Sequence, residues 1–192
     1  MEQKERKTDL RVIKTREAIH SAFREMVCEM DADQITIKEL TDRARIHTKT
    51  FYLHYTSIEA LYADLLTQVG NEIKELLSTL PVPINPAETV RTVYEYLASK
   101  DQFIEKLICN NTYREFCNNL FTSVMKYNKD RYNPFSNLPE DEFNIITTYL
   151  STTLLDIYRQ WVADKKKMSL NRLIEIASTL TANGFYGMIN QP

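Results

Sequence analysis

Apolar residues along this chain recur at steps of three and four, which is the spacing of amphipathic helices. The first such stretch covers about residues 10 to 30, where Val12, Ile19 and Phe23 share one face. Asp9 stands just before it and is the expected N-cap. The alternation of apolar and polar residues that indicates a strand is not found, nor is an internal repeat. The pattern predicts an all-α fold that opens on one long helix.

Two short helices are expected directly after the long one. Thr36 is followed three residues later by Glu39, a capping box that starts a helix of about two turns. The next helix begins near His47 or Thr48 and carries Phe51, which we expect to turn inward against the helix before it. Two short helices joined by a tight turn behind a bracing helix form a helix-turn-helix, whose second short helix enters the major groove of DNA.

The rest of the chain keeps the helical pattern over a larger region. A long helix is expected after Ser57, and its apolar stripe consists of Leu61, Leu65, Val69, Ile73, Leu76 and Leu80. Three prolines, Pro81, Pro83 and Pro86, are expected to end it. Further helices follow, with a loop over 132–139 and two last helices that begin near residues 140 and 169. We therefore expect an N-terminal helix-turn-helix domain over residues 1–56 and a larger helical domain over 57–192.

The charge distribution adds a candidate surface for DNA. The chain carries 24 Lys and Arg against 26 Asp and Glu, a net charge of −2, yet the segment from Arg43 to Tyr55 has three cations and no carboxylate. A solvated helix face carries such charges as well, so charge alone does not decide. The expected exposed face of the second short helix offers hydroxyls, an ammonium, a phenol and an imidazole from Thr48, Lys49, Thr50, Tyr52 and His54. Such a surface is compatible with phosphate.

Other residue counts narrow the class of protein. Only 3 of 192 residues are Gly, which argues against glycine-rich nucleotide-binding loops. The 3 Cys, with no signal peptide before them, fit a reducing compartment better than a disulfide scaffold. No apolar run approaches the roughly 20 residues that a membrane span needs. We therefore expect a cytoplasmic protein without membrane contact and without a cofactor.

The run from Ile37 to Tyr55, together with Ser57 to Leu61, resembles the DNA-binding signature of the TetR family. The most specific part of the match is Thr50-Phe51-Tyr52-Leu53-His54-Tyr55, and the resemblance covers about residues 10 to 62. It implies a homodimeric transcription factor that binds double-stranded DNA at a near-palindromic operator. It also implies that the larger helical domain binds a ligand and dimerises, most simply as a ligand-responsive repressor.

The resemblance further implies roles for single residues. Thr36, Thr50, Tyr52 and His54 would hold DNA phosphates, while Thr48 and Lys49 stand where family members vary and read bases. The complete expected DNA-binding set is Thr36, Lys38, His47, Thr48, Lys49, Thr50, Tyr52 and His54.

Three positions depart from the family pattern. Arg45 stands where the family has a turn glycine, so a positive φ there would cost about 1–2 kcal/mol. His47 replaces a serine N-cap, and Thr48 is an alternative cap that would shift the helix start by one residue. Ile58 replaces a lysine, which removes one phosphate contact at the head of the following helix.

The larger domain offers a ligand site and a dimer interface. A cavity for a small apolar or aromatic effector is expected among Phe103, Tyr113, Phe116, Cys117 and Tyr149, although such residues also serve as ordinary helix packing. In the family the two last helices form an intermolecular four-helix bundle. The corresponding interface residues here are Leu154, Ile157, Trp161, Leu173, Ala177, Leu180 and Gly184, among which Ala177 and Gly184 permit close approach. As an alternative, the apolar faces of these two last helices could complete the core of a monomer.

Two other functions were weighed against the DNA-binding one. An enzyme is disfavoured because all 3 His lie within the first 54 residues and no catalytic motif appears. His47 and His54 are seven residues apart, roughly 10 Å along a helix, which excludes a shared metal ion. A regulator or activator of the same family that responds to a protein partner stays open. Cys109 and Cys117 are expected as buried thiols, with a redox pair as the alternative.

Overall fold

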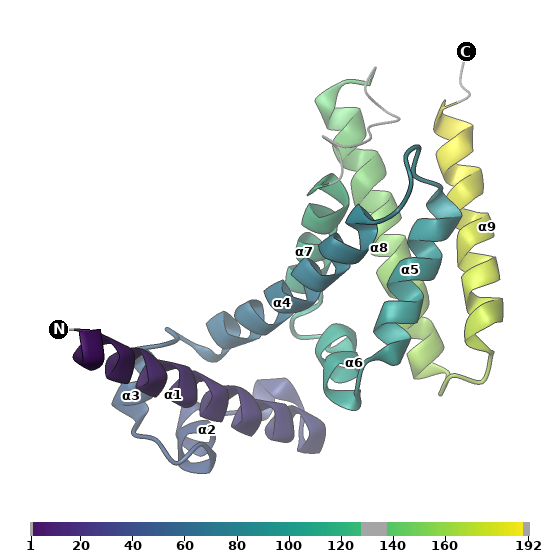
Figure 1. Cartoon of the computed structure of the whole chain (residues 1–192). Helices are drawn as coiled ribbons and strands as arrows, with labels where there is room; N and C mark the ends of the chain where they lie inside the picture. The colour runs from purple at the N-terminus through teal and green to yellow at the C-terminus, as the bar shows by residue number, and fades with distance from the viewer. Residues whose placement is uncertain (1, 128–137, 190–192) are drawn as a thin grey trace. The chain divides into compact units, whose positions relative to one another are not determined.

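The structure is a computed structural model that describes residues 2–127 and 138–189, with side chains from 10 to 127 and from 138 to 184. The backbone is helical and, within those ranges, contains no strand (Figure 1). The α-helices are α1 (Glu2–Glu29), α2 (Ile37–Arg43), α3 (Thr48–Tyr52), α4 (Ile58–Ser78), α5 (Pro86–Ser99), α6 (Gln102–Cys109), α7 (Arg114–Tyr127), α8 (Glu140–Ala163) and α9 (Leu170–Ile189). The expectation of an all-α fold is confirmed.

The chain divides into two compact units after Leu65, so the first turns of α4 belong to the first unit. The sequence-based boundary lies nine residues earlier, at residue 56. The later boundary has a physical reason, because Leu61 and Tyr62 of α4 are fully buried and the Tyr62 ring meets Phe23 of α1 edge-on, 6.5 Å between centroids.

In the first unit, α2 packs on α1 and α3 packs on α2. The buried side chains come from all four helices and include Ile19, Phe23, Met26, Leu40, Phe51 and Leu61. Burial of these apolar side chains is the main force that holds the short helices, which at five and seven residues are too short to be stable alone. Phe51 is fully buried, as the sequence predicted.

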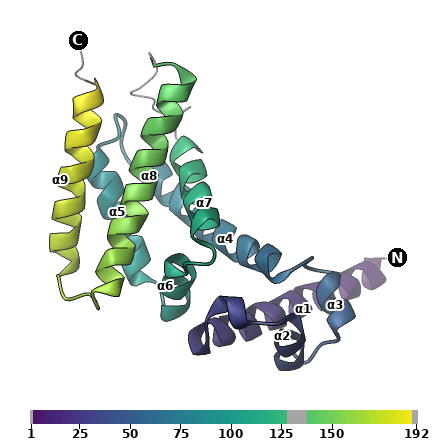
Figure 2. The same ribbon diagram turned by 180° about the vertical axis from the view of Figure 1, so that it is seen from behind.

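In the second unit, α5 packs mainly on α9, and α7 packs mainly on α8 (Figures 1 and 2). Its core contains a row of tyrosines and phenylalanines, among them Tyr94, Phe103, Phe121 and Tyr158. The Tyr94 hydroxyl donates a 2.8 Å hydrogen bond to the carbonyl of Leu154, which ties α5 to α8. No helix in the described ranges is long and apolar enough to cross a membrane.

Three local expectations need correction. Asp9 lies inside α1, which begins at Glu2, because the charged residues before it continue the helix. Pro86 does not end the long helix but begins α5, where its missing N–H costs nothing and Asn85 caps the helix. Leu76 is 39% exposed, and Leu77 takes the core position instead, because the helical stripe drifts over five turns. The expected loop over 132–139 lies outside the described residues except for Leu138 and Pro139.

Candidate nucleic-acid interface

The helix α2 begins with the predicted capping box. The Thr36 hydroxyl accepts a 3.2 Å hydrogen bond from the Glu39 amide, while the Glu39 carboxylate accepts from the Thr36 amide at 3.3 Å. The Thr36 hydroxyl also donates its single hydrogen to that carboxylate at 2.7 Å. These hydrogen bonds hold the pKa of Glu39 below its ordinary value. Thr36 is exposed, but its hydrogen is already committed, so a phosphate contact from it requires exchange with Glu39.

The turn between α2 and α3 is closed by backbone hydrogen bonds around Arg45. The Arg45 amide donates to the carbonyl of Asp42 at 3.2 Å, and the Ile46 amide donates to the carbonyl of Thr41 at 3.0 Å. This pair of bonds is a Schellman motif, which needs a left-handed residue after the helix. Arg45 fills that place with a φ of 55° although it is not glycine. The turn therefore keeps its geometry against the steric cost of a Cβ, about 1–2 kcal/mol.

The helix α3 begins at Thr48, with His47 as an N-cap whose side chain makes no capping bond. The alternative in which Thr48 is the cap is therefore wrong: Thr48 is the first helical residue, and its hydroxyl lies 3.3 Å from that of Thr41 on α2. The carbonyl of His47 accepts from the Thr50 amide at 2.7 Å. The weak cap is tolerated because Phe51 anchors the helix in the core.

The expected DNA-binding side chains of the first unit differ in their exposure. Thr36, Lys38, His47, Thr48, Lys49 and Tyr52 are exposed, and Thr50 and His54 are half-buried. Leu53 is the most exposed large apolar residue there, at 83%. Among the described residues, no hydrogen bond or ion pair involves the side chains of Lys38, Arg45 or Lys49. Arg43, by contrast, is paired with Glu29 of α1 at 2.7 Å.

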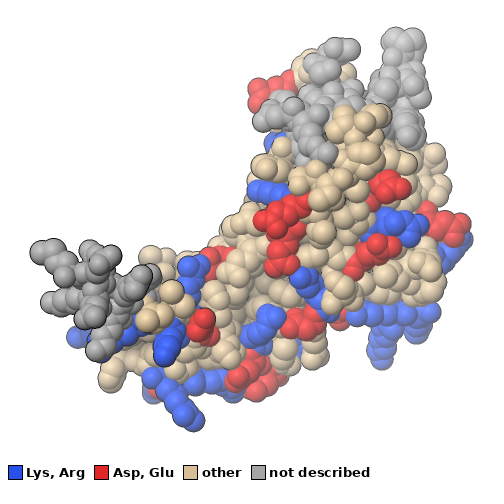
Figure 3. Space-filling view, in the orientation of Figure 1, with Lys and Arg blue, Asp and Glu red and all other residues tan. Residues whose placement is uncertain are grey.

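Cations and carboxylates lie side by side on this unit (Figure 3). Asp42 and Glu39 are exposed on α2, while α3 itself carries Lys49 and no carboxylate. The surface that would meet phosphates is therefore α3 and its preceding turn, and α2 borders it with mixed charge.

A cluster of polar side chains braces the end of the helix-turn-helix against α1 and α4. The Tyr55 hydroxyl donates to Asp64 at 2.8 Å and accepts from Arg16 Nε at 3.0 Å. Arg16 Nη2 lies 2.6 Å from both Asp64 oxygens, and His20 Nε2 lies 2.6 Å from the Tyr55 hydroxyl. Because the single hydroxyl hydrogen is given to Asp64, His20 must donate through Nε2–H.

The pKa shifts in this cluster match that assignment. Burial lowers the pKa of His20, which keeps the ring neutral. Burial and the bond to Asp64 raise the pKa of Tyr55 to about 12. Burial works to raise the pKa of Asp64, but the hydrogen bonds from Arg16 and Tyr55 outweigh it, so the net shift is downward. Sequence reasoning missed Arg16, His20 and Asp64, since residues 48 apart in sequence leave no local pattern.

The expected effector site is divided by the structure. Phe103 and Cys117 are buried and Tyr113 is half-buried, but Phe116 is 42% and Tyr149 is 53% exposed. Phe116 and Tyr149 therefore do not line an internal cavity together with the others. Their helices α7 and α8 turn these two side chains outward, a rotation that the sequence pattern alone left open.

The expected dimer residues are divided in the same way. Leu154, Trp161, Leu173 and Ala177 are buried within the chain, Ile157 and Gly184 are half-buried, and Leu180 is 51% exposed. A side chain buried in its own core has no free surface for a partner, so the first four residues belong to the subunit core. Among the side chains that the structure describes on these two helices, the exposed large apolar ones are instead Ile145 (70%) and Tyr149 (53%) on α8, with Leu180 on α9.

Both Cys109 and Cys117 keep free thiols, half-buried and buried respectively. Burial raises the pKa of each to about 11, so both are neutral thiols at neutral pH. The buried-thiol expectation is confirmed for Cys117, while Cys109 is half-buried. The charge of Arg159 works to lower both pKa values, but burial outweighs it.

Comparisons with known proteins agree with this architecture. A protein-family model described as "Transcriptional regulator C-terminal region" matches residues 85–183. An uncharacterised HTH-type transcriptional regulator of Bacillus subtilis, YxbF, is 36% identical over 87 residues, which is 45% of this chain. The match spans only 22% of that relative's own length.

Two solved structures share the fold. A TetR transcriptional regulator from Streptococcus agalactiae superposes with a TM-score of 0.67 at 20% identity, covering 91% of this chain and 97% of that one. The transcriptional regulator FadR from Bacillus subtilis, solved in complex with stearoyl-CoA, has a TM-score of 0.54 at 15% identity and covers 88% and 98%. At these identities the likeness is one of fold.

Proposed function

This chain belongs to the TetR family of transcriptional regulators, and from that premise we propose that it is a homodimeric, ligand-responsive repressor that binds a near-palindromic operator through α3. The observation that carries the proposal is the α3 surface: an exposed lysine, hydroxyls and a phenol with no carboxylate, on a helix held by a buried Phe51. Two such helices in successive major grooves would contact half-sites about one turn of DNA apart. The protein would act in the cytoplasm, on double-stranded DNA.

Within this proposal the residues divide by role. Thr48 and Lys49 stand in the first turn of α3, the part of a recognition helix that reaches base edges. Thr50, Tyr52 and His54 would hold the flanking phosphates, with Lys38 and His47 beside them, and Arg45 adds an unpaired cation at the turn. Thr36 contributes only if Glu39 releases its hydroxyl hydrogen.

The test of DNA recognition starts from genomic fragments bound by the purified protein, from which the shared site is read. Lys49→Ala is expected to weaken binding to that site by about 5- to 160-fold, since a base contact is worth about 1–3 kcal/mol. The control is Lys167→Ala, which removes the same charge from an exposed position in the turn after α8 and should leave binding unchanged. Equal effects of the two substitutions would refute the assignment of α3.

Dimerisation is proposed through α8 and α9. Ile145, Tyr149 and Leu180 leave an exposed apolar surface on these helices, and Tyr149 Cε1 would lie only 3.5 Å from a Cβ at Gly184. Exposed apolar side chains that lie together on neighbouring helices are found where subunits meet. Tyr149→Lys and Leu180→Lys should each convert the dimer to monomer in sedimentation experiments. Tyr127→Lys, at a 58% exposed tyrosine on α7, is the control that should stay dimeric.

The effector is proposed to be a small apolar or aromatic molecule held in the second unit. Ligand binding would release DNA only if it prefers a dimer whose DNA-binding units are wrongly spaced. The FadR relative was solved with stearoyl-CoA, which supports a ligand with an apolar body for a domain of this fold.

A second candidate is control by a protein partner, acting as repressor or activator. It is favoured by the exposure of Phe116, which was expected inside the ligand site but lies on the surface of α7. Phe116→Ser should then abolish regulation in cells while leaving DNA affinity and small-molecule binding intact. If the Phe116→Ser protein regulates like the wild type, the protein-partner candidate fails.

A further inference from the structure

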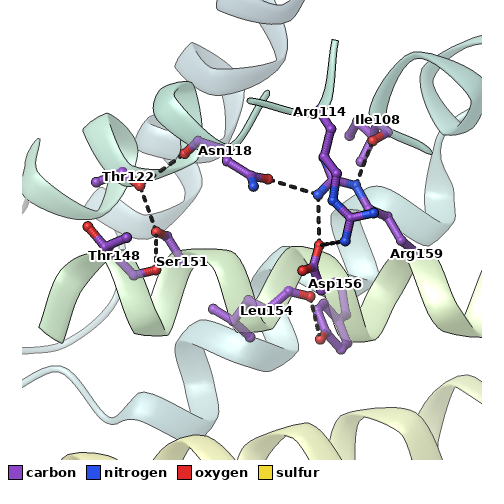
Figure 4. A network of polar contacts seen from close by, with 10 residues as sticks. Ile108, Arg114, Asn118, Thr122, Thr148, Ser151, Leu154, Asp156 and Arg159 are labelled. Atoms are coloured by element: carbon purple, nitrogen blue, oxygen red, sulfur yellow. Dashed lines mark hydrogen bonds and ion pairs between the residues drawn. The ribbon is translucent and has the colours of Figure 1, made fainter. Parts of the chain in front are cut away.

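Arg159, on α8, is a buried cation that ties three helices together. Its side chain is only 8% exposed. Nε donates to the carbonyl of Ile108 at the end of α6, at 2.9 Å. Nη1 donates to Asn118 Oδ1 of α7 at 2.8 Å and to Asp156 Oδ1 at 2.9 Å. Figure 4 shows the guanidinium between these groups.

The remaining nitrogen of Arg159, Nη2, has no partner. It is buried from solvent, and neither of its two N–H groups makes a hydrogen bond among the described residues. The hydroxyl of Tyr158, a residue that is 1% exposed, is the other buried side-chain atom there without a partner. Buried donors in native proteins are nearly always paired, so the open donor of Arg159 calls for an acceptor.

The charges around Arg159 do not balance. Asp156 Oδ1 is shared between Arg159 at 2.9 Å and Arg114 Nη2 at 2.7 Å, so one carboxylate serves two guanidinium groups. Glu105, on the neighbouring α6, is paired with Lys166. The carbonyl of Ile108 supplies only a partial negative charge. The cluster therefore carries about one uncompensated positive charge, which favours an anion.

No group of the chain itself takes the place of that anion. The charge of Arg159 works to lower the pKa of the Cys109 and Cys117 thiols. Burial outweighs it and raises the pKa of each to about 11, so neither is a thiolate at neutral pH. Burial also raises the pKa of Tyr158, so its phenol stays neutral and can donate. The buried residues that α6, α7 and α8 contribute to the core of this unit include apolar and aromatic ones: Phe103, Leu107, Ile108, Phe121 and Leu155.

We propose that Arg159 Nη2 binds the carboxylate of the effector, and that the effector is an organic acid with an apolar or aromatic body. A carboxylate offers two oxygens to the guanidinium, and the bond would be charge-assisted in surroundings that exclude water. The apolar residues of this core accept the body of the acid. This inference rests on the proposed ligand response and names the chemical class of the ligand.

The test compares acids with their neutral amides in the absence of DNA. Benzoate, phenylacetate and hexanoate, each paired with its primary amide, are titrated into the full-length protein and followed by ligand-observed NMR. At least one acid should bind about tenfold or more tighter than its amide, because the neutral amide carries no negative charge to pair with the guanidinium. If no acid binds in preference to its amide, the proposal fails. Because DNA is absent, a failure of DNA binding, which would refute the proposed function, leaves this result readable.

Two variants assign the preference to Arg159. Arg159→Met keeps an unbranched apolar stem but has no charge and no donor, and should remove the preference for acid over amide. Arg114→Gln removes the second cation from the same cluster but no open donor, and should weaken acid binding by less than Arg159→Met does. A preference that survives in Arg159→Met overturns the assignment. If Arg159→Met does not fold, the acid–amide comparison and competition with inorganic phosphate on the wild type decide: equal binding of phosphate would contradict an organic acid.

Discussion

Arg45→Gly is expected to stabilise the first unit, although it removes a surface cation and adds flexibility. Arg45 holds a φ of 55° in the Schellman motif after α2. A Cβ in this conformation costs about 1–2 kcal/mol, while glycine loses about 0.5–1 kcal/mol more backbone entropy on folding. The difference leaves a net gain of about 0.5–1 kcal/mol for glycine, in which the removed steric cost outweighs the added entropy.

The matched control for this prediction is Arg45→Ala, which removes the same charge but keeps the Cβ. The free energy of unfolding should be higher for Arg45→Gly than for Arg45→Ala, in urea denaturation followed by far-UV circular dichroism. Amide hydrogen exchange in α2 and α3 should slow in the same order. Equal stability of the two variants would refute the claim that the left-handed conformation is strained.

A second turn in the chain is closed by the same pair of hydrogen bonds, although there two consecutive residues, Lys165 and Lys166, are left-handed. Lys165 follows α8 with a φ of 57°, its amide donates to Val162, and the Lys166 amide donates to Trp161, each at 2.9 Å. The free energy of unfolding should therefore be higher for Lys165→Gly than for Lys165→Ala by a similar margin. The measurement is urea denaturation followed by the fluorescence of Trp161. Agreement between the two sites would show that the effect comes from the motif and not from DNA binding.

Three further predictions concern other groups. The pKa of Tyr55 is raised from its ordinary value near 10 to about 12. Its contribution to stability is therefore present below pH 10 and is lost as the pH rises towards 12. The urea midpoint of the wild type should fall over this pH range, and Tyr55→Phe should not show that fall. Glu39→Gln keeps the capping box but removes a carboxylate beside the DNA surface, and should tighten DNA binding by about threefold at low salt, with unchanged binding contradicting a phosphate near Thr36. Cys117 is fully buried with a pKa raised to about 11, so iodoacetamide at pH 8 should leave it unmodified in the native protein, as peptide mass spectrometry would show, and modify it in urea.

The first unit could be predicted closely because its signals are local. The Thr36 and Glu39 pair fixes the start of α2, and the inward Phe51 follows from the pattern of α3. The family has a glycine at the position of Arg45. The sequence could therefore predict a positive φ for Arg45 only if the turn kept the family's geometry. The brace from Arg16 to Asp64 could not be found, because its partners meet only after three helices have packed.

The second unit shows where periodicity stops being informative. An apolar stripe shows which face of a helix is buried but not whether it packs within the subunit or against a second one. Leu173 and Ala177 were therefore expected at a dimer interface, whereas they lie in the subunit core. A rotation of about 100° per residue separates the exposed Leu76 from the buried Leu77, and the pattern of α8 likewise did not show that Tyr149 is 53% exposed. Whether a buried donor such as Arg159 Nη2 finds a hydrogen-bond partner depends on the positions of all the side chains around it, which come from several helices. The sequence pattern therefore does not reveal it.

The central claim, that α3 of a dimer binds duplex DNA, is tested most directly by the salt dependence of binding to the selected operator. If the DNA-binding surface of each subunit contacts about four phosphates, the dimer contacts about eight. A plot of log K against log salt concentration should then have a slope near −7. Lys49→Ala should lower the affinity, and Lys167→Ala should leave both affinity and slope unchanged. A slope near zero, or affinity that does not depend on the sequence of the duplex, would contradict the account.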